Sequence, residues 1–293
     1  MTIPWKTVGA VPSSELWDAR RALHWAVQAA ASIGKQLVAP RLDGGEQSLV
    51  WDGNLGLLIQ DPVSGAAPSF RSALRLEPPA LVLTDEAGES AAEFSLAGRT
   101  LAEAYAWLAR EAEARLGRPL EKPLERPAAD KPEETEMPDH PVAHGAPFEV
   151  SRQAAAELAR WFDDGEIAIA AVAESAGNAS PLRVWPHHFD LAIVLTLEGE
   201  GEDARALYVG MTPGDVARPA PYFYVTPWPP PENPEPQPLP AGGVWNRDPW
   251  FGAVLEGARL IEAGDGAAQA ARTEEFFRAA IPAARRFALG GKA

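Results

Sequence analysis

Residues 180–192 carry the sequence SPLRVWPHHFDLA and run directly into the apolar segment IVLTL. Side chains alternate between the two faces of an extended strand, so Trp185 and Phe189 fall on the same face as the leucines that follow. The sequence therefore predicts one strand over residues 182–197 with a buried apolar face. Pro186 leaves a second interpretation open, because a proline can bulge a strand and break the alternation.

The rest of the chain predicts an α+β fold, mainly antiparallel sheet with helices packed on it. Apolar residues spaced three to four apart are typical of helices, and short apolar runs separated only by turn residues are typical of antiparallel meanders. We expect helices at residues 13–34, 100–117, 151–162, 249–263 and 265–289. We expect strands at residues 37–42, 49–51, 55–60, 72–76, 81–84, 93–96, 182–197, 204–211 and 220–228.

The order helix, strands, helix occurs twice, which divides the chain into two halves. Residues 119–149 contain seven prolines and many charges, so they predict an irregular connection over the surface. We expect an N-terminal half over residues 1–118, this connection, and a C-terminal half over residues 150–293, packed as one globular unit. The repeated order is compatible with a duplication, with two sheets or with one continuous sheet.

Composition excludes several classes of function. The net charge of −15 comes from 41 acidic and 26 basic residues, and it repels nucleic acids and anionic membranes. The absence of cysteine excludes disulfides and thiolate chemistry. No apolar run approaches a spanning helix and no signal peptide is apparent, so a cytoplasmic location is expected. No dinucleotide or phosphate-loop motif is present, and no cofactor is expected. The oligomeric state is left undetermined.

The histidines suggest two kinds of chemistry. His188 and Asp190 share one face of the expected strand, at a spacing where a carboxylate can orient an imidazole. A metal site made by these two residues with His140 and His144 is a weaker alternative, because the spacing matches no known metal motif. The competing interpretation gives Asp190 a structural role at a turn. We therefore expect no metal to be required for folding.

The first helix offers a polar stripe. Trp17, His24 and Gln28 lie along one line beside its apolar face, and Lys35 follows at its end. Such a stripe predicts either one wall of a pocket or a hydrogen-bonded lid on the sheet. Tyr224 belongs to a group of aromatic residues near a proline-rich segment, which predicts core packing or an aromatic cleft.

Taken in order, several short motifs resemble a family of uncharacterised bacterial proteins of about the length of this chain, a domain of unknown function. The motifs are Trp17-Asp18, Leu23-His24, Gln28, Gly34-Lys35, His144, Ser180-Pro181, Phe189-Asp190-Leu191-Ala192, Gly210, Pro213-Gly214 and Phe223-Tyr224. The resemblance implies that the matched polar positions line a shared pocket: His24, Gln28, Lys35, His144 and Asp190.

The function expected from these observations is the binding of a small molecule, with catalysis left open. His24, Gln28, His144 and Asp190 are expected to converge, and His24→Ala is expected to abolish binding while changing stability by no more than roughly 1 kcal/mol. The alternative is a non-catalytic interaction or structural protein that uses its acidic surface and proline-rich loops.

Overall fold

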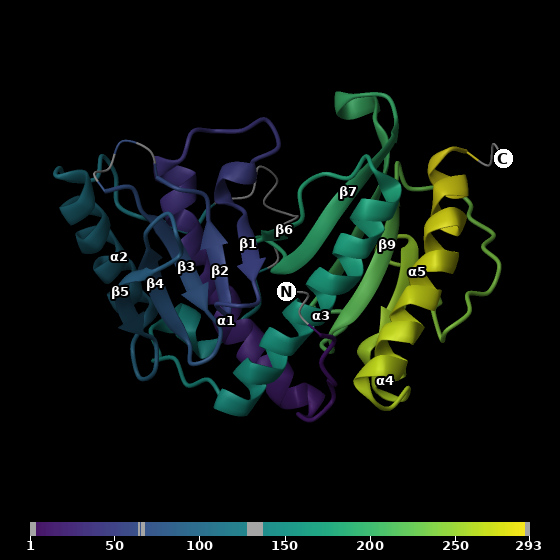
Figure 1. Cartoon of the computed structure of the whole chain (residues 1–293), viewed down its shortest axis with the longest axis horizontal. Coiled ribbons are helices and arrows are strands. Elements are labelled where there is room, and N and C mark those ends of the chain that lie inside the picture. Colours follow the sequence, from purple (N-terminus) through teal and green to yellow (C-terminus); the bar gives the residue numbers. More distant parts are fainter. Residues whose placement is uncertain (1–3, 64, 66–67, 128–136, 291–293) are drawn as a thin grey trace.

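The computed structural model describes residues 4–63, 65, 68–127 and 137–290, and its centre is a single antiparallel sheet (Figure 1). Within these residues eleven strands pair in the order β10-β11-β9-β8-β7-β6-β1-β2-β3-β4-β5. Five α-helices accompany the sheet. The predicted α+β class with helices packed on an antiparallel sheet is therefore confirmed, and the two halves share one continuous sheet.

The N-terminal half is a meander of five strands between two helices. Its strands are β1 Leu49–Asp52, β2 Leu57–Gln60, β3 Arg71–Arg75, β4 Ala80–Thr84 and β5 Ser90–Ser95. Its helices are α1 Ser13–Leu37 and α2 Leu101–Leu116. Helix α2 begins with the predicted capping box, in which the side chains of Thr100 and Glu103 satisfy each other's backbone N–H groups.

The C-terminal half has six strands and three helices. Its strands are β6 Arg183–Trp185, β7 Asp190–Glu198, β8 Arg205–Thr212, β9 Tyr222–Trp228, β10 Val244–Asn246 and β11 Gly252–Glu256. Its helices are α3 Arg152–Ala176, α4 Gly257–Ile261 and α5 Gly266–Ala288. Across both halves and the connection, short 3-10 turns lie at Gly45–Gln47, Pro141–His144 and Gly201–Asp203. No helix among the described residues has the length and apolar character needed to cross a membrane.

The two halves meet at a narrow seam between β1 and β6. Leu49 on β1 pairs with Val184 on β6, and this is the one register pair between the two strands in the described part of the chain. The sheet twists along its length, as antiparallel sheets do. As a result α1 lies behind the N-terminal strands in Figure 1, whereas α3 and α5 lie in front of the C-terminal strands.

One face of the sheet carries the main core, under the helices. Phe162 of α3, Trp161 of α3 and Phe223 of β9 are fully buried, and the Phe223 ring also meets Phe277 of α5 edge-on. The alternate residues of the same strands point to the other face. The face on which a strand residue lies therefore decides which other residues it can meet in a site, because a side chain on one face of the sheet cannot reach the helices on the other face.

The stretch that suggested one long strand folds as a hairpin instead. β6 ends at Trp185, a turn follows, and β7 begins at Asp190, which pairs with Trp185. Phe189 has a φ of 59°, in the left-handed region, and reverses the chain direction. The prediction of one strand over residues 182–197 was therefore wrong. The alternation does break after Trp185, as the alternative allowed, but at a hairpin turn and not at a bulge within one strand. Phe189 is buried in the helix-covered core, whereas Trp185 shares the opposite face with Asp190.

Three other element predictions were wrong. Residues 38–42 form no strand. The segment predicted as a helix at residues 249–263 contains β11 and the short α4, because its apolar residues alternate along a sheet strand before the helix begins. The helix expected at residues 151–162 continues through residues 166–172 as the single helix α3.

Gly34 does not end the first helix, as its position had suggested. It lies inside α1, where its N–H donates to the Gln60 side chain at 2.5 Å. A Cβ built on Gly34 would lie 2.2 Å from the backbone oxygen of Glu46. The position therefore requires glycine for close approach of the neighbouring segments, and not for helix termination.

Candidate functional site

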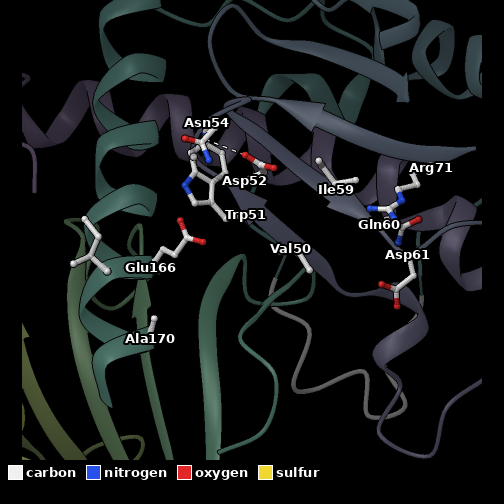
Figure 2. Close-up of a pocket in the computed structure, with 12 residues that line it drawn as sticks. Val50, Trp51, Asp52, Asn54, Ile59, Gln60, Asp61, Arg71, Glu166 and Ala170 are labelled. Atoms are coloured by element: carbon white, nitrogen blue, oxygen red, sulfur yellow. Dashed lines mark hydrogen bonds between the residues drawn. The ribbon is translucent and has the colours of Figure 1, made fainter. Parts of the chain in front are cut away.

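A cleft of about 460 Å³ opens where the uncovered face of the N-terminal strands meets the flank of α3 (Figure 2). It lies beside the seam, where β1 departs from β6. The twist of the sheet turns this part of the uncovered face toward α3. Twelve residues line it: Val50, Trp51, Asp52, Gly53, Asn54, Ile59, Gln60, Asp61, Arg71, Glu166, Ile167 and Ala170.

The wall on the N-terminal strands is apolar at its centre and charged at one end. Val50 of β1 is 40% exposed, and its register partner Ile59 of β2 lies beside it. Arg71 begins β3 at the far end of the cleft in Figure 2. Among the described residues its guanidinium has no hydrogen-bond or ion-pair partner, and its Nε is buried. Arg71 is therefore a cation available to a ligand.

The charges next to Arg71 are already paired. Asp61 forms ion pairs with Arg41 at 2.7 Å and with Arg183 at 3.1 Å. Arg75, two residues further along β3, is paired with Glu93. The unpaired state of Arg71 thus distinguishes it from the neighbouring arginines.

The opposite wall is the flank of α3, where Glu166 points toward Trp51 and Asp52 (Figure 2). Burial, together with the neighbouring carboxylates Asp163 and Asp52, raises the pKa of Glu166 from its ordinary 4.5 to about 7. Glu166 forms no hydrogen bond or ion pair with another described residue. A carboxyl group with a pKa near neutrality can accept or donate a proton under physiological conditions.

The top of the cleft is held rigid by hydrogen bonds. The Trp51 indole Nε1 donates to Oδ1 of Asp163 at 3.0 Å, which joins β1 to α3. Oδ1 of Asp52 accepts from the backbone N–H groups of Asn54 and Leu55 at 3.0 and 3.1 Å, which fixes the turn after β1. These contacts position the two walls independently of any ligand.

The residues predicted to form a shared pocket have other places in the structure. The Nε2 of His24 donates to the carbonyl oxygen of Pro186 at 2.7 Å, and Nδ1 accepts from Arg20 at 3.0 Å. The Gln28 amide donates to the same carbonyl. His24 is fully buried against the ring of Phe189, with 5.5 Å between centroids. The polar stripe of α1 is therefore a hydrogen-bonded clamp on the turn between β6 and β7.

The electrostatics of His24 agree with this structural role. Burial lowers its pKa well below the ordinary 6.5, and the charge of Arg20 lowers it further. Both ring nitrogens are committed, because a carbonyl only accepts and a guanidinium only donates. A neutral imidazole with both nitrogens engaged has no capacity left for a ligand or a metal.

We expect His24→Ala to lower the free energy of unfolding by about 2–4 kcal/mol, since it leaves a cavity and removes a donor and an acceptor in the core. This reverses the expectation from sequence, which placed the change within roughly 1 kcal/mol. Urea unfolding measures it. His144→Ala is the control, with a change of about 0.5 kcal/mol or less, because the His144 side chain is 73% exposed. Equal stabilities of the two variants would contradict the clamp.

The other predicted residues are dispersed. The Lys35 Nζ forms an ion pair with Glu46 at 3.0 Å. His144 bonds to Asp139 at 2.9 Å on the surface, and the Trp17 ring receives the guanidinium of Arg20 at 5.4 Å. The structure does not bring these side chains together with His24 and Gln28 in one concave site.

Asp190 and Tyr224 are the two predicted residues that do meet. The Tyr224 hydroxyl donates to Oδ2 of Asp190 at 2.5 Å, on the sheet face opposite the helices. His24 lies on the helix-covered side, so the predicted approach of His24 to Asp190 was wrong. His188 lies exposed in the hairpin turn, where its backbone oxygen accepts from Arg20 at 2.9 Å.

Metal ligation has no support in the described part of the chain, where no group of three or more His, Asp or Glu side chains is placed to hold an ion. The alternative metal site of His140, His144, His188 and Asp190 does not form such a group. His140 instead caps the turn that follows it, with Nδ1 accepting from the backbone N–H of Val142 at 3.3 Å.

Sequence reasoning did not identify Arg71 or Glu166. Glu166 was predicted at the start of a separate apolar segment over residues 166–172, although Asp163 and Glu166 lie three apart on what is one helix. Arg71 directly precedes the strand predicted at residues 72–76, where a charged residue gives no signal of its own. Comparison of this chain with protein-family models, with curated proteins and with solved structures finds no match.

Proposed function

We propose that the protein binds a small organic molecule in the cleft between β1, β3 and α3. The observation that carries the proposal is that Arg71 and Glu166, on opposite walls of one cleft, have no hydrogen-bond or ion-pair partner among the residues that the structure describes. Its volume of about 460 Å³ falls within the range of small-molecule sites.

The walls indicate the chemistry of the ligand. Arg71 favours a carboxylate or phosphate, because a guanidinium presents parallel N–H donors that match two oxygens of such a group. Val50 and Ile59 favour an apolar body next to that anionic group. Glu166 favours a hydrogen-bonding group such as a hydroxyl or an amine, because the carboxyl can accept a hydrogen bond when ionised and donate one when protonated.

Catalysis, if the ligand is a substrate, would fall to Glu166 as a general acid or base. Its raised pKa provides both protonation states near neutrality, which is the condition for efficient proton transfer. A cytoplasmic location and kinship with the uncharacterised bacterial family remain predictions.

The proposal is tested by a thermal-shift screen with small carboxylates and phosphate esters. A ligand that binds only the folded state raises the melting temperature in proportion to RT ln(1 + [L]/Kd). We expect a ligand from this panel to stabilise the protein and Arg71→Gln to lower its affinity at least about tenfold. Glu166→Gln should alter the pH dependence of binding near pH 7.

Arg75→Gln is the matched control, because it removes an arginine from the same strand whose charge is already paired with Glu93. It should leave the affinity unchanged. Binding that survives Arg71→Gln, or that Arg75→Gln weakens equally, contradicts the cleft as the site.

One observation favours the alternative function, a non-catalytic interaction protein. Tyr208, Trp228 and Val244 are 40%, 45% and 45% exposed, and strand parity places all three on the uncovered face of the C-terminal strands. Exposed apolar residues on one face are typical of interaction surfaces. Concentration-dependent sedimentation that Trp228→Ser abolishes would support this alternative.

A further inference from the structure

A second polar site lies on the uncovered face of the C-terminal strands, away from the cleft. Asp190, at the start of β7, is only 7% exposed. Its Oδ2 accepts the Tyr224 hydroxyl at 2.5 Å, whereas its Oδ1 is buried without a hydrogen-bond partner among the described residues. A buried carboxylate oxygen without a donor is energetically unfavourable and calls for an explanation.

Two small residues allow Tyr224 to reach Asp190. Gly210 on β8 pairs with Tyr224 on β9 and with Ala192 on β7. A Cβ on Gly210 would lie 2.5 Å from the Tyr224 ring, so the ring lies directly over the glycine. The phenol thereby crosses β8 and meets the carboxylate two strands away. The absence of a side chain at Gly210 thus allows the Tyr224 phenol and the Asp190 carboxylate to meet.

Tyr224 is a permanent donor in this pair. Burial raises its pKa well above the ordinary 10, and the Asp190 carboxylate raises it further. The phenol therefore stays protonated at any physiological pH. It satisfies one carboxylate oxygen and leaves the other to a different donor.

Aromatic residues lie next to Asp190 and Tyr224 on this face. Trp185 on β6 pairs with Asp190 across the hairpin, and paired residues point to the same face. The ring of Trp250 meets Tyr224 edge-on at 6.4 Å, and Tyr222 lies 6.3 Å from Tyr224. Trp185 and Tyr224 are half-buried, so part of each side chain stays accessible from solvent on this face.

The arginines nearest along this face are already paired with other acceptors. Arg183 pairs with Asp61 at 3.1 Å. Arg218 donates to Asn246 at 2.8 Å and lies 3.7 Å from Glu256. Neither arginine forms an ion pair with Asp190 in the described part of the chain. As far as the described residues go, Oδ1 of Asp190 is therefore open to a donor from outside the chain.

We infer that Asp190, Trp185 and Tyr224 form a binding site for a small alkylammonium group. An ammonium N–H would donate to Oδ1 of Asp190, which lacks a donor, and its positive charge would compensate the carboxylate. The aromatic rings would hold the alkylated part, because the faces of Trp and Tyr rings attract cations. This site is separate from the cleft, so a negative result for one of the two proposals does not contradict the other.

The test is a titration of the full chain with methylammonium chloride, observed by saturation-transfer NMR on the methyl group, at constant ionic strength set with sodium chloride. We expect saturable binding of methylammonium. Tetramethylammonium should bind at least about fivefold more weakly, because it has no N–H for Oδ1. If methylammonium does not bind, or binds no better than tetramethylammonium, the inference fails and a bound water accounts for Oδ1.

Three variants localise the binding. Asp190→Asn should weaken methylammonium binding at least about tenfold, while its amide oxygen still accepts from Tyr224. Tyr224→Phe keeps the ring and should bind methylammonium at least as tightly as the parent protein. Asp215→Asn is the matched control, since Asp215 already accepts from Tyr222 and from the backbone of Arg218. Equal loss in the Asp215 and Asp190 variants would show a nonspecific charge effect and overturn the site.

Discussion

Replacing Phe189 by alanine is expected to lower the free energy of unfolding by about 3–5 kcal/mol. The side chain is fully buried, and its ring contacts His24 of α1 and Phe162 of α3, each with 5.5 Å between ring centroids. It therefore joins the two long helices through the hairpin turn. Alanine shares the left-handed backbone penalty of phenylalanine, so the loss reports side-chain packing.

Urea unfolding at neutral pH measures the change, with Trp228→Ala as the control. Trp228 is an aromatic residue on the sheet with 45% exposure, and its removal should cost about 1 kcal/mol or less. If Phe189→Ala lost less than about 1 kcal/mol, the hairpin turn would not be anchored in the core as described.

Asp164→Asn is expected to stabilise the protein above pH 7, by up to about 4 kcal/mol. Asp164 is fully buried on α3, and its pKa is raised from the ordinary 3.8 to about 7. Burial is the largest cause, and the charges of Asp163 and Glu157 offset part of the opposing effect of Lys6. Its Oδ1 accepts from the backbone N–H of Lys6 at 2.8 Å, which an asparagine oxygen can also do.

The direction follows from proton linkage. A carboxyl group whose folded pKa is raised holds its proton better in the folded state, so its contribution to stability is present below about pH 4 and is lost as pH rises to about 7. The parent protein should therefore lose stability across this window relative to the variant. Urea unfolding of both proteins from pH 4.5 to 8.5 gives the difference, and parallel pH profiles would contradict it.

Asp163→Asn provides the contrast within the same helix. Asp163 accepts from Trp51 at 3.0 Å and forms an ion pair with the Lys6 ammonium at 2.5 Å. An asparagine oxygen can still accept from Trp51, but the buried partner of the Lys6 ammonium loses its charge, so this variant should lose stability at pH 8, where Asp164→Asn gains it.

Periodicity was sufficient to predict most of the elements. Short apolar runs separated by turn residues are typical of a meander, and they predicted the strands at residues 49–52, 71–75, 80–84 and 205–212. The capping box predicted the start of α2. These signals depend on residues close together in the sequence, so they can be recognised without knowledge of the rest of the fold. The order of the strands across the seam is not local, and the sequence left it open.

The hairpin at residues 185–190 shows where such reasoning ends. An alternating pattern cannot distinguish one long strand from two short ones with a tight turn between them. The decision rests on the left-handed conformation of Phe189, which is favoured by contacts to His24 and Phe162 from distant parts of the chain. Phe189 is not a residue type that typically adopts this conformation, so its sequence gives no warning.

The candidate site was beyond sequence reasoning for a related reason. Polar residues that stand out in a sequence, such as His24 and Gln28, proved to satisfy a buried carbonyl. The cleft instead depends on Arg71 and Glu166 having no partner within the described part of the chain. Whether a side chain has a partner depends on which residues the fold places beside it, and a sequence motif does not show this.

The single register pair that joins β1 to β6 also has a mechanical consequence. Bending the molecule at Leu49 and Val184 disturbs one ladder pair, whereas bending it anywhere inside either half disturbs several. The cleft lies beside this line, and the clamp from α1 to the Pro186 carbonyl acts as a splint across it. The stiffness of this line therefore comes from side chains that cross it, the clamp and the Trp51–Asp163 hydrogen bond, and not from the backbone ladder.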